Sequence, residues 1–237
     1  MNEAGLNVLA IGAHPDDIEL GCGAALLAHR RAGHAVTMLV MTAGLGPAEQ
    51  RARPDEQEEA AALLRASLMW GGFEDGQVPP DGPAVRVIED AITQTGAQVI
   101  YTHAAGDSHQ DHRAVAASTA AAARRTQRML CYESPTSLGF SPTHFVDVDG
   151  LVEAKLGLIR AHLSQVMKNG LVDLEAVEAQ ARFRGFQARV RHAEAFEATR
   201  FVWDIPRHTR PGDEVGALNN DEVGALNKRA LNKEVTL

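Results

Sequence analysis

The fold is decided by LNVLAIGAHPDDIELGCGAALLAHRRAGHAVTMLVM, residues 6–41. Leu6–Gly12 is a short apolar run that ends in glycine, which predicts a buried parallel strand. Leu20–Ala32 has apolar residues at helical spacing and precedes Gly33, a residue type that commonly ends helices. Ala35–Met41 predicts a second buried strand. A strand, a helix and a strand in succession indicate the first unit of a parallel α/β sheet.

The same alternation continues along the chain. Helices are expected at 48–66, 83–95 and 110–125, and strands at 97–102 and 129–132. A further strand is expected at 143–148, helices at 151–166 and 174–191, and a last strand at 201–205. This order predicts a mostly parallel sheet with helices on both faces, that is, a three-layer α/β/α domain spanning residues 1–210.

The end of the chain has a different character. DEVGALN occurs twice, at Asp213–Asn219 and Asp221–Asn227. Because this repeat has no strong apolar face, residues 211–237 are expected to be either a disordered tail or an extension added to the natural chain. No function is expected there.

Composition and charge narrow the classes of function. A chain of 237 residues, with 45% hydrophobic and 23% charged residues, is typical of a soluble globular protein. The formal net charge of -8 argues against broad nucleic-acid binding and favours a small-molecule substrate. Two cysteines are too few for a disulfide framework, which favours a reducing, cytoplasmic location. With no signal-peptide pattern or long apolar run, no membrane insertion is expected.

Two clusters of metal-binding residue types follow predicted strands. The first contains His14, Asp16 and Asp17. The second is DSHQDH, at 107–112. Because ligands of parallel sheets gather at the carboxyl ends of the strands, both clusters are expected to meet at one edge. Imidazole and carboxylate suit Zn²⁺ or Fe²⁺ better than Ca²⁺. Each cluster alone has structural explanations, such as helix capping, but the pair favours a metal site.

These residue types fit amide hydrolysis. Three protein ligands with one open position are typical of a catalytic zinc, which activates water. A neighbouring carboxylate can act as general base, and a histidine opposite it can stabilise the oxyanion of a tetrahedral intermediate.

Two segments, AHPDDIELGCGA at 13–24 and HAAGDSHQDHRAV at 103–115, resemble the two defining motifs of the LmbE-like (PIG-L) family of N-deacetylases. FVDVDGLVEAKLGLIRAHLSQV at 145–166 and FRGFQARVRHAEAF at 183–196 also resemble that family. The resemblance implies a Rossmann-like fold, a zinc-dependent N-deacetylase and an N-acetylated amino-sugar substrate, free or in a conjugate. It also implies a homo-oligomer.

Carried over residue by residue, the resemblance makes His14, Asp17 and His112 the metal ligands. Asp16 becomes the general base.

The resemblance also assigns roles to His109 and Arg53, whereas the other candidates are chosen by their place in the sequence. His109 becomes the residue that polarises the carbonyl and stabilises the oxyanion. Asp111 is expected to orient one of the active-site histidines. Arg53, Asp75 and Asp107 are the candidates for contacts with the substrate.

Three alternatives stay open from the sequence. A nucleotide-binding dehydrogenase would share the opening strand and helix, but the turn lacks the GxGxxG spacing. A non-catalytic Rossmann-like binding protein would keep the fold without the chemistry. A hydrolase of another amide, such as a carbamoyl group, would keep both the metal and the fold.

Overall fold

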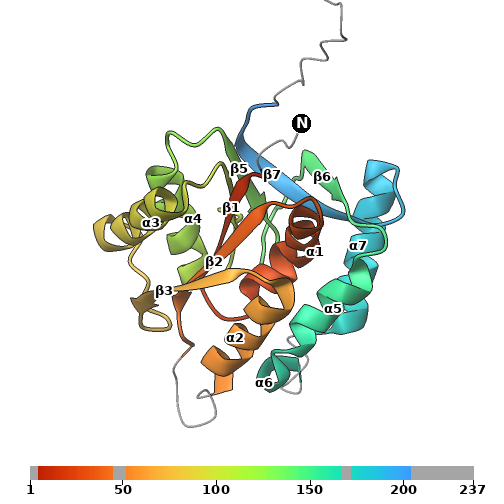
Figure 1. The fold of residues 1–237 in the computed structure, drawn as a ribbon, viewed down its shortest axis with the longest axis horizontal. Coiled ribbons are helices and arrows are strands. Elements are labelled where there is room, and N and C mark those ends of the chain that lie inside the picture. Colours follow the sequence, from red (N-terminus) through yellow and green to blue (C-terminus); the bar gives the residue numbers. More distant parts are fainter. Residues whose placement is uncertain (1–4, 45–51, 167–171, 204–237) are drawn as a thin grey trace, which may run out of the picture. The chain divides into compact units, whose positions relative to one another are not determined.

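Seven strands form one sheet at the centre of the described chain (Figure 1). The structure is a computed structural model that describes residues 5–44, 52–166 and 172–203. All described residues up to Val202 belong to one compact unit. The tail expected at 211–237 lies outside the described residues.

The sheet has the order β3-β2-β1-β4-β5-β7-β6. Its first five strands are parallel. β7 pairs antiparallel with β5, and β6 pairs antiparallel with β7 at the edge of the sheet. The prediction of a mostly parallel sheet is therefore confirmed. The strands are β1 (Asn7–Gly12), β2 (Ala35–Thr42), β3 (Ser67–Phe73), β4 (Val99–His103), β5 (Arg128–Tyr132), β6 (His144–Asp147) and β7 (Ala193–Phe201).

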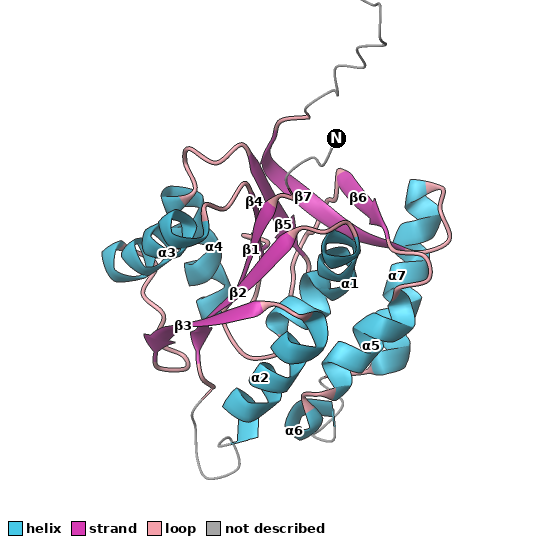
Figure 2. Ribbon diagram, viewed as in Figure 1, coloured by secondary structure: helices cyan, strands magenta, loops and turns pink. Residues whose placement is uncertain are grey.

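Helices cover both faces of the sheet (Figure 2). Along β1, Val8 and Ala10 belong to the apolar core beneath α1, α2 and α5, whereas Leu9 and Ile11 belong to the core beneath α3 and α4. This alternation explains why β1 is an uninterrupted apolar run. The helices are α1 (Asp17–Arg31), α2 (Arg53–Leu64), α3 (Gly82–Thr95), α4 (Gln110–Ala122), α5 (Val152–Arg160), α6 (Leu163–Val166) and α7 (Leu174–Ala188).

A third apolar cluster lies between α1, α5 and α7. In the described part of the chain, no helix combines the length and apolar character that crossing a membrane requires.

The strand order reverses beside β1, and this reversal positions the site. From β1 the chain proceeds through β2 to β3 on one side, and then returns through β4 and β5 on the other. The loops that follow β1 and β4 therefore leave the same edge of the sheet as direct neighbours, at the place where open α/β sheets bind their ligands.

Several predicted boundaries were wrong. The last strand was predicted to begin at Phe201, whereas the last strand observed, β7, ends at that residue. The helix expected from Leu20 begins at Asp17, and the helix expected at 151–166 is divided into α5 and α6. In β7, AEAFEA is rich in alanine and glutamate, residue types that are depleted in strands, so its composition concealed it.

Candidate functional site

The loop after β1 presents two adjacent carboxylates in different directions. Asp17 is the first residue of α1, and Asp16 precedes it with φ 93° and ψ -25°, in the left-handed region. Non-glycine residues rarely adopt this conformation, and aspartate and asparagine tolerate it best. The turn separates the two side chains, which both line one pocket.

Asp17 is the centre of a group of buried histidines. Its Oδ2 accepts a hydrogen bond from the backbone N–H of His14 at 2.7 Å and lies 3.4 Å from Nδ1 of the His14 ring. Its Oδ1 lies 3.3 Å from His112 Nε2, and its Oδ2 lies 3.2 Å from His103 Nε2. Burial raises the pKa of Asp17, but the charges of His103 and His112 outweigh burial and hold this pKa well below its usual range. The carboxylate is thus ionised.

Carboxylates behind the rings orient two of these histidines. His112 Nδ1 lies 3.0 Å from Asp107 Oδ2, which leaves Nε2 free to bind a cation. His14 Nε2 lies 3.1 Å from both Asp111 Oδ2 and Asp75 Oδ1, which leaves its Nδ1 free. Both free nitrogens face the ionised carboxylate of Asp17. Outer carboxylates that fix ring orientation in this way are typical of metal sites.

The donor set fits a divalent transition metal. Nitrogen and carboxylate donors together suit Zn²⁺ or Fe²⁺ better than Ca²⁺, which prefers oxygen alone. The expected ligands His14, Asp17 and His112 belong to overlapping sets of closely spaced donor residues, but these three do not form such a set by themselves. Among the residues that the structure describes, three sets have donor atoms that all lie within 4.8 Å of one another: His14, His109 and His112; Asp17, His103 and His112; and His14, Asp75 and Asp111.

Helix α2 holds the peptide unit that joins Pro15 and Asp16. Arg53 Nη2 donates to the Pro15 carbonyl at 2.6 Å, and the Asp16 N–H donates to Gln57 Oε1 at 3.3 Å. Arg53 and Gln57 lie one turn apart on α2, so both point to the same side. Together they fix both polar atoms of one peptide and support the left-handed conformation of Asp16.

The environment of Asp16 raises its pKa toward neutrality. Burial and the neighbouring Asp17 charge raise the pKa of Asp16 to about 7, although Arg53 opposes the shift. Arg53 Nη2 lies 3.6 Å from Asp16 Oδ1. A carboxyl group with a pKa near neutrality suits proton transfer.

A buried polar layer lies behind Asp16. Gln57 Nε2 donates to Glu19 Oε1 at 2.7 Å, and His162 Nε2 lies 3.3 Å from the same oxygen. All three side chains are buried. None of them was expected from the sequence, because their partners come from three different helices or helix ends.

His109 occupies the N-cap of α4 at the other side of the pocket. Its Nδ1 accepts a hydrogen bond from the Asp111 N–H at 3.2 Å, so the neutral ring carries its proton on Nε2. Burial and the neighbouring His14 lower the pKa of His109, which favours this neutral form. His109 can therefore donate a hydrogen bond from Nε2.

Seven of the nine expected site residues line one pocket of about 200 Å³ that is open to solvent. The other two, Asp107 and Asp111, lie behind it with exposed fractions of 3% and 1%. Asp107 accepts hydrogen bonds from Ser134 Oγ at 2.6 Å and from the His109 N–H at 2.8 Å. The expected residues that line the pocket are His14, Asp16, Asp17, Arg53, Asp75, His109 and His112.

His103 was also missed, although it begins the second motif. It is the last residue of β4, is fully buried, and accepts a hydrogen bond from the Ala13 N–H at 3.1 Å. Its position at the carboxyl end of a strand was the signal that could have identified it.

The paired clusters and their fold match known proteins. The family model for GlcNAc-PI de-N-acetylase, PIG-L, matches residues 9–123, which contain both clusters. The uncharacterized deacetylase YaiS of Escherichia coli (strain K12) is 34% identical over 180 residues, covering 66% of this chain and 90% of YaiS. This chain belongs to the PIG-L family of deacetylases.

Solved structures share the PIG-L fold. The N,N'-diacetylchitobiose deacetylase from Pyrococcus horikoshii superposes with a TM-score of 0.70 at 23% identity, covering 81% of this chain and 82% of that one. GalB, the 4-carboxy-2-hydroxymuconate hydratase from Pseudomonas putida KT2440, gives a TM-score of 0.72 at 19% identity, covering 86% and 98%. Because one fold supports two chemistries, function must be argued from the site.

Proposed function

We propose that this PIG-L protein is a metal-dependent hydrolase that removes an N-acetyl group from an amino sugar or an amino-sugar conjugate. The observation that carries the proposal is the position of Asp16, beside the ionised Asp17 and its histidines, in an open pocket. A neighbouring cavity of about 400 Å³ shares Leu20, Pro135 and Val172 with that pocket, which leaves space for a conjugate. The name of the chitobiose deacetylase supports the sugar substrate.

The metal would be held by His14, Asp17 and His112. We propose Zn²⁺, with Fe²⁺ as the alternative that the same donors accept. A metal bound there would supply a Lewis acid and would lower the pKa of water. Asp111 and Asp107 orient His14 and His112 through the ring nitrogens that face away from the metal position.

The remaining residues move protons and bind the substrate. Asp16 accepts the proton of the attacking water and then delivers it to the departing amine nitrogen. The Nε2–H of His109 donates to the carbonyl oxygen as negative charge develops on it. Asp75, whose side chain is 29% exposed, is available to sugar hydroxyl groups, and Arg53 lines the same wall. Asp107 is assigned to His112, and not to substrate, because it is engaged within the protein.

Metal analysis together with acetate release tests this proposal. The purified protein would be incubated with N-acetylglucosamine, N,N'-diacetylchitobiose and an N-acetylglucosaminyl conjugate, with an N-carbamoyl sugar as the competing amide. We expect a bound transition metal and release of acetate together with a free amine. A protein that neither retains a transition metal nor releases acetate would overturn the proposal, and turnover of the carbamoyl sugar alone would favour the other hydrolase.

Replacing His109 by alanine should lower kcat by about 10²- to 10³-fold, as expected for a lost oxyanion donor. Metal content, measured by mass spectrometry, should stay near the wild-type value, because His14, Asp17 and His112 remain. Parallel loss of metal and activity would instead make His109 a ligand.

Replacing Gln57 by leucine should lower kcat about tenfold, which corresponds to about 1.4 kcal/mol in the activation barrier. The change removes the acceptor of the Asp16 N–H but leaves the carboxylate in place. Gln98→Leu is the matched control, because Gln98 Oε1 accepts the Asn7 N–H at 3.1 Å, at the start of β1. Equal kcat values for the two variants would contradict a role for Gln57 at the site.

A further inference from the structure

Helix α1 is broken close to the site. Cys22 has φ -144° and ψ 17°, which are not helical angles, so two helical segments meet there. In a regular helix the N–H groups of Ala24 and Ala25 would donate to the carbonyls of Leu20 and Gly21. A break inside the core leaves such groups in need of other partners, because unpaired buried polar groups are costly.

A buried ion pair supplies these partners. Glu194 Oε1 accepts the Ala24 N–H at 3.0 Å, and Oε2 accepts the Ala25 N–H at 2.7 Å. Lys155 Nζ donates to the Leu20 carbonyl at 2.7 Å and to Glu194 Oε1 at 2.6 Å. Lysine and glutamate are thus inserted where the helical bond between Leu20 and Ala24 would be.

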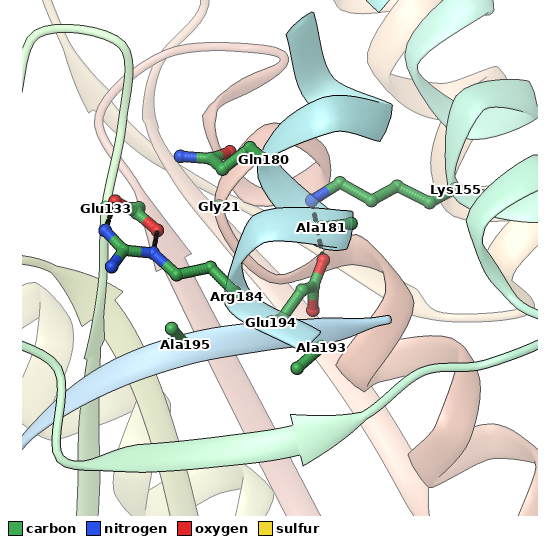
Figure 3. A pocket seen from close by; sticks show the side chains of 9 residues that line it. All are labelled: Gly21, Glu133, Lys155, Gln180, Ala181, Arg184, Ala193, Glu194 and Ala195. Carbon is green, nitrogen blue, oxygen red and sulfur yellow. Dashed lines mark hydrogen bonds and ion pairs between the residues drawn. The ribbon is translucent and has the colours of Figure 1, made fainter. Parts of the chain in front are cut away.

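The pair comes from outside the helix that it completes. Lys155 lies on α5 and Glu194 on β7, and each side chain is 4% exposed (Figure 3). A buried ion pair seldom adds net stability compared with well-packed apolar residues. Its hydrogen bonds to both ends of the break indicate a more specific role.

A second ion pair lines the same pocket as Lys155 and Glu194 but is differently placed. Arg184 Nε and Nη2 donate to the Glu133 carboxylate at 2.7 and 2.6 Å (Figure 3). Within the part of the chain that the structure describes, neither of these side chains forms a hydrogen bond or ion pair with α1. This pair therefore offers a matched comparison.

The break separates the first turn of α1, which carries Asp17, from the rest of the helix. Gly21 in that segment lies so close to the Tyr132 ring that a Cβ atom would collide with it. The Tyr132 hydroxyl donates to the Ile11 carbonyl at 2.8 Å, so the ring is anchored to β1. The segment that bears the carboxylate is therefore packed against the sheet.

We propose that Lys155 and Glu194 are positioning residues for the candidate metal centre, because they hold open the break in α1 that directs Asp17 toward His14 and His112. The inference rests on the proposed function for its metal. Among the described residues, the pair forms no hydrogen bond or ion pair with the histidines around Asp17 and does not line the pocket that contains Asp16. It would therefore act through the backbone of α1.

The double variant K155M/E194M tests the proposal. It replaces both charges by apolar side chains of similar length, so neither charge is left unpaired and the variant should fold. We expect at least tenfold weaker Co²⁺ binding and an altered Co²⁺ absorption spectrum, with a melting temperature near the wild-type value. The control E133M/R184M should retain the wild-type affinity and spectrum. Equal losses in both double variants, or no loss in K155M/E194M, would overturn the proposal.

A measurement on the metal-free protein separates this inference from the proposed function. The ¹³Cα and ¹³Cβ chemical shifts of Cys22 report whether its backbone is helical. We expect non-helical shifts in the wild type and helical shifts in K155M/E194M, as the regular bonds of α1 re-form. Unchanged shifts in the variant would overturn the role of the pair. If the wild type binds no metal, but the Cys22 shifts become helical in K155M/E194M, only the proposed function would be refuted.

Discussion

Replacing Asp16 by asparagine is expected to reduce turnover by about 10³- to 10⁴-fold, the upper range for loss of a general base. The amide cannot accept the proton of the attacking water. Asparagine tolerates the left-handed backbone at φ 93°, so the peptide held by Arg53 and Gln57 should keep its place. Alanine would add backbone strain at this position, and its effect would be harder to interpret.

The measurements are kcat on the best N-acetylated substrate and the metal content of the same preparation. Metal content should remain near the wild-type value, because the proposed ligands are unchanged. Asp90→Asn, on the exposed side of α3, provides the control for loss of one carboxylate. An Asp16→Asn variant that keeps wild-type turnover would remove Asp16 from the mechanism, and one that loses its metal would make Asp16 a ligand.

Replacing His112 by alanine should have the opposite signature, with metal lost first and activity lost as a consequence. Loss of an outer partner of a ligand typically weakens metal affinity by 10- to 100-fold, so loss of the ligand itself should weaken it by more than about 100-fold. His112 Nε2 faces Asp17, and its Nδ1 is oriented by Asp107. The variant also leaves Asp107 without one of its partners.

Metal occupancy would be measured after dialysis against a weak chelator, and activity would be measured with and without added Zn²⁺. We expect the dialysed variant to contain no metal and to recover part of its activity at high Zn²⁺. His144→Ala is the control, because His144 lies on β6 with Nδ1 2.9 Å from the Thr143 hydroxyl oxygen, apart from the cluster. An inactive variant with full metal content would contradict the ligand role and move His112 to the chemical step.

The two proposed roles are distinguishable because the structure separates them along one short loop. Asp17 turns toward the histidines, whereas Asp16 turns toward Arg53 and Gln57. The same separation accounts for the pKa values, since the histidines lower that of Asp17 while burial and the Asp17 charge raise that of Asp16. Asp16→Asn should therefore impair proton transfer, and His112→Ala should impair metal binding.

The sheet and the meeting of the two clusters could be predicted from sequence because both depend on local patterns. Apolar runs such as Leu6–Gly12 are long enough to identify buried parallel strands. Once strands and helices alternate, the loops after β1 and β4 must leave the same edge, so His14 and His112 are brought together by connectivity alone. The family motifs lie in these same loops, which is why the family assignment was also confirmed.

Contacts between distant segments could not be predicted in this way. Gln57 forms its bonds with residues about 40 positions earlier, and nothing in the helical pattern of α2 distinguishes it from its neighbours. Asp107 is a candidate for substrate contact by its position in the motif, but tertiary packing brings Ser134 against it and occupies its carboxylate. Strand β7 was placed too late because alanine and glutamate do not resemble a strand.

The α/β fold, the family and the edge of the sheet that carries the candidate site follow from local sequence patterns, because strand periodicity and short motifs act over a few residues. The directions of the Asp16 and Asp17 side chains, and the residues that hold them, depend on contacts between distant segments. LGCGAALL has helical spacing throughout, yet α1 breaks at Cys22, where Lys155 and Glu194 replace its backbone bonds. Buried polar groups need hydrogen-bond partners, and the partners come from segments that are distant in sequence. A local sequence pattern therefore does not predict which residues they are.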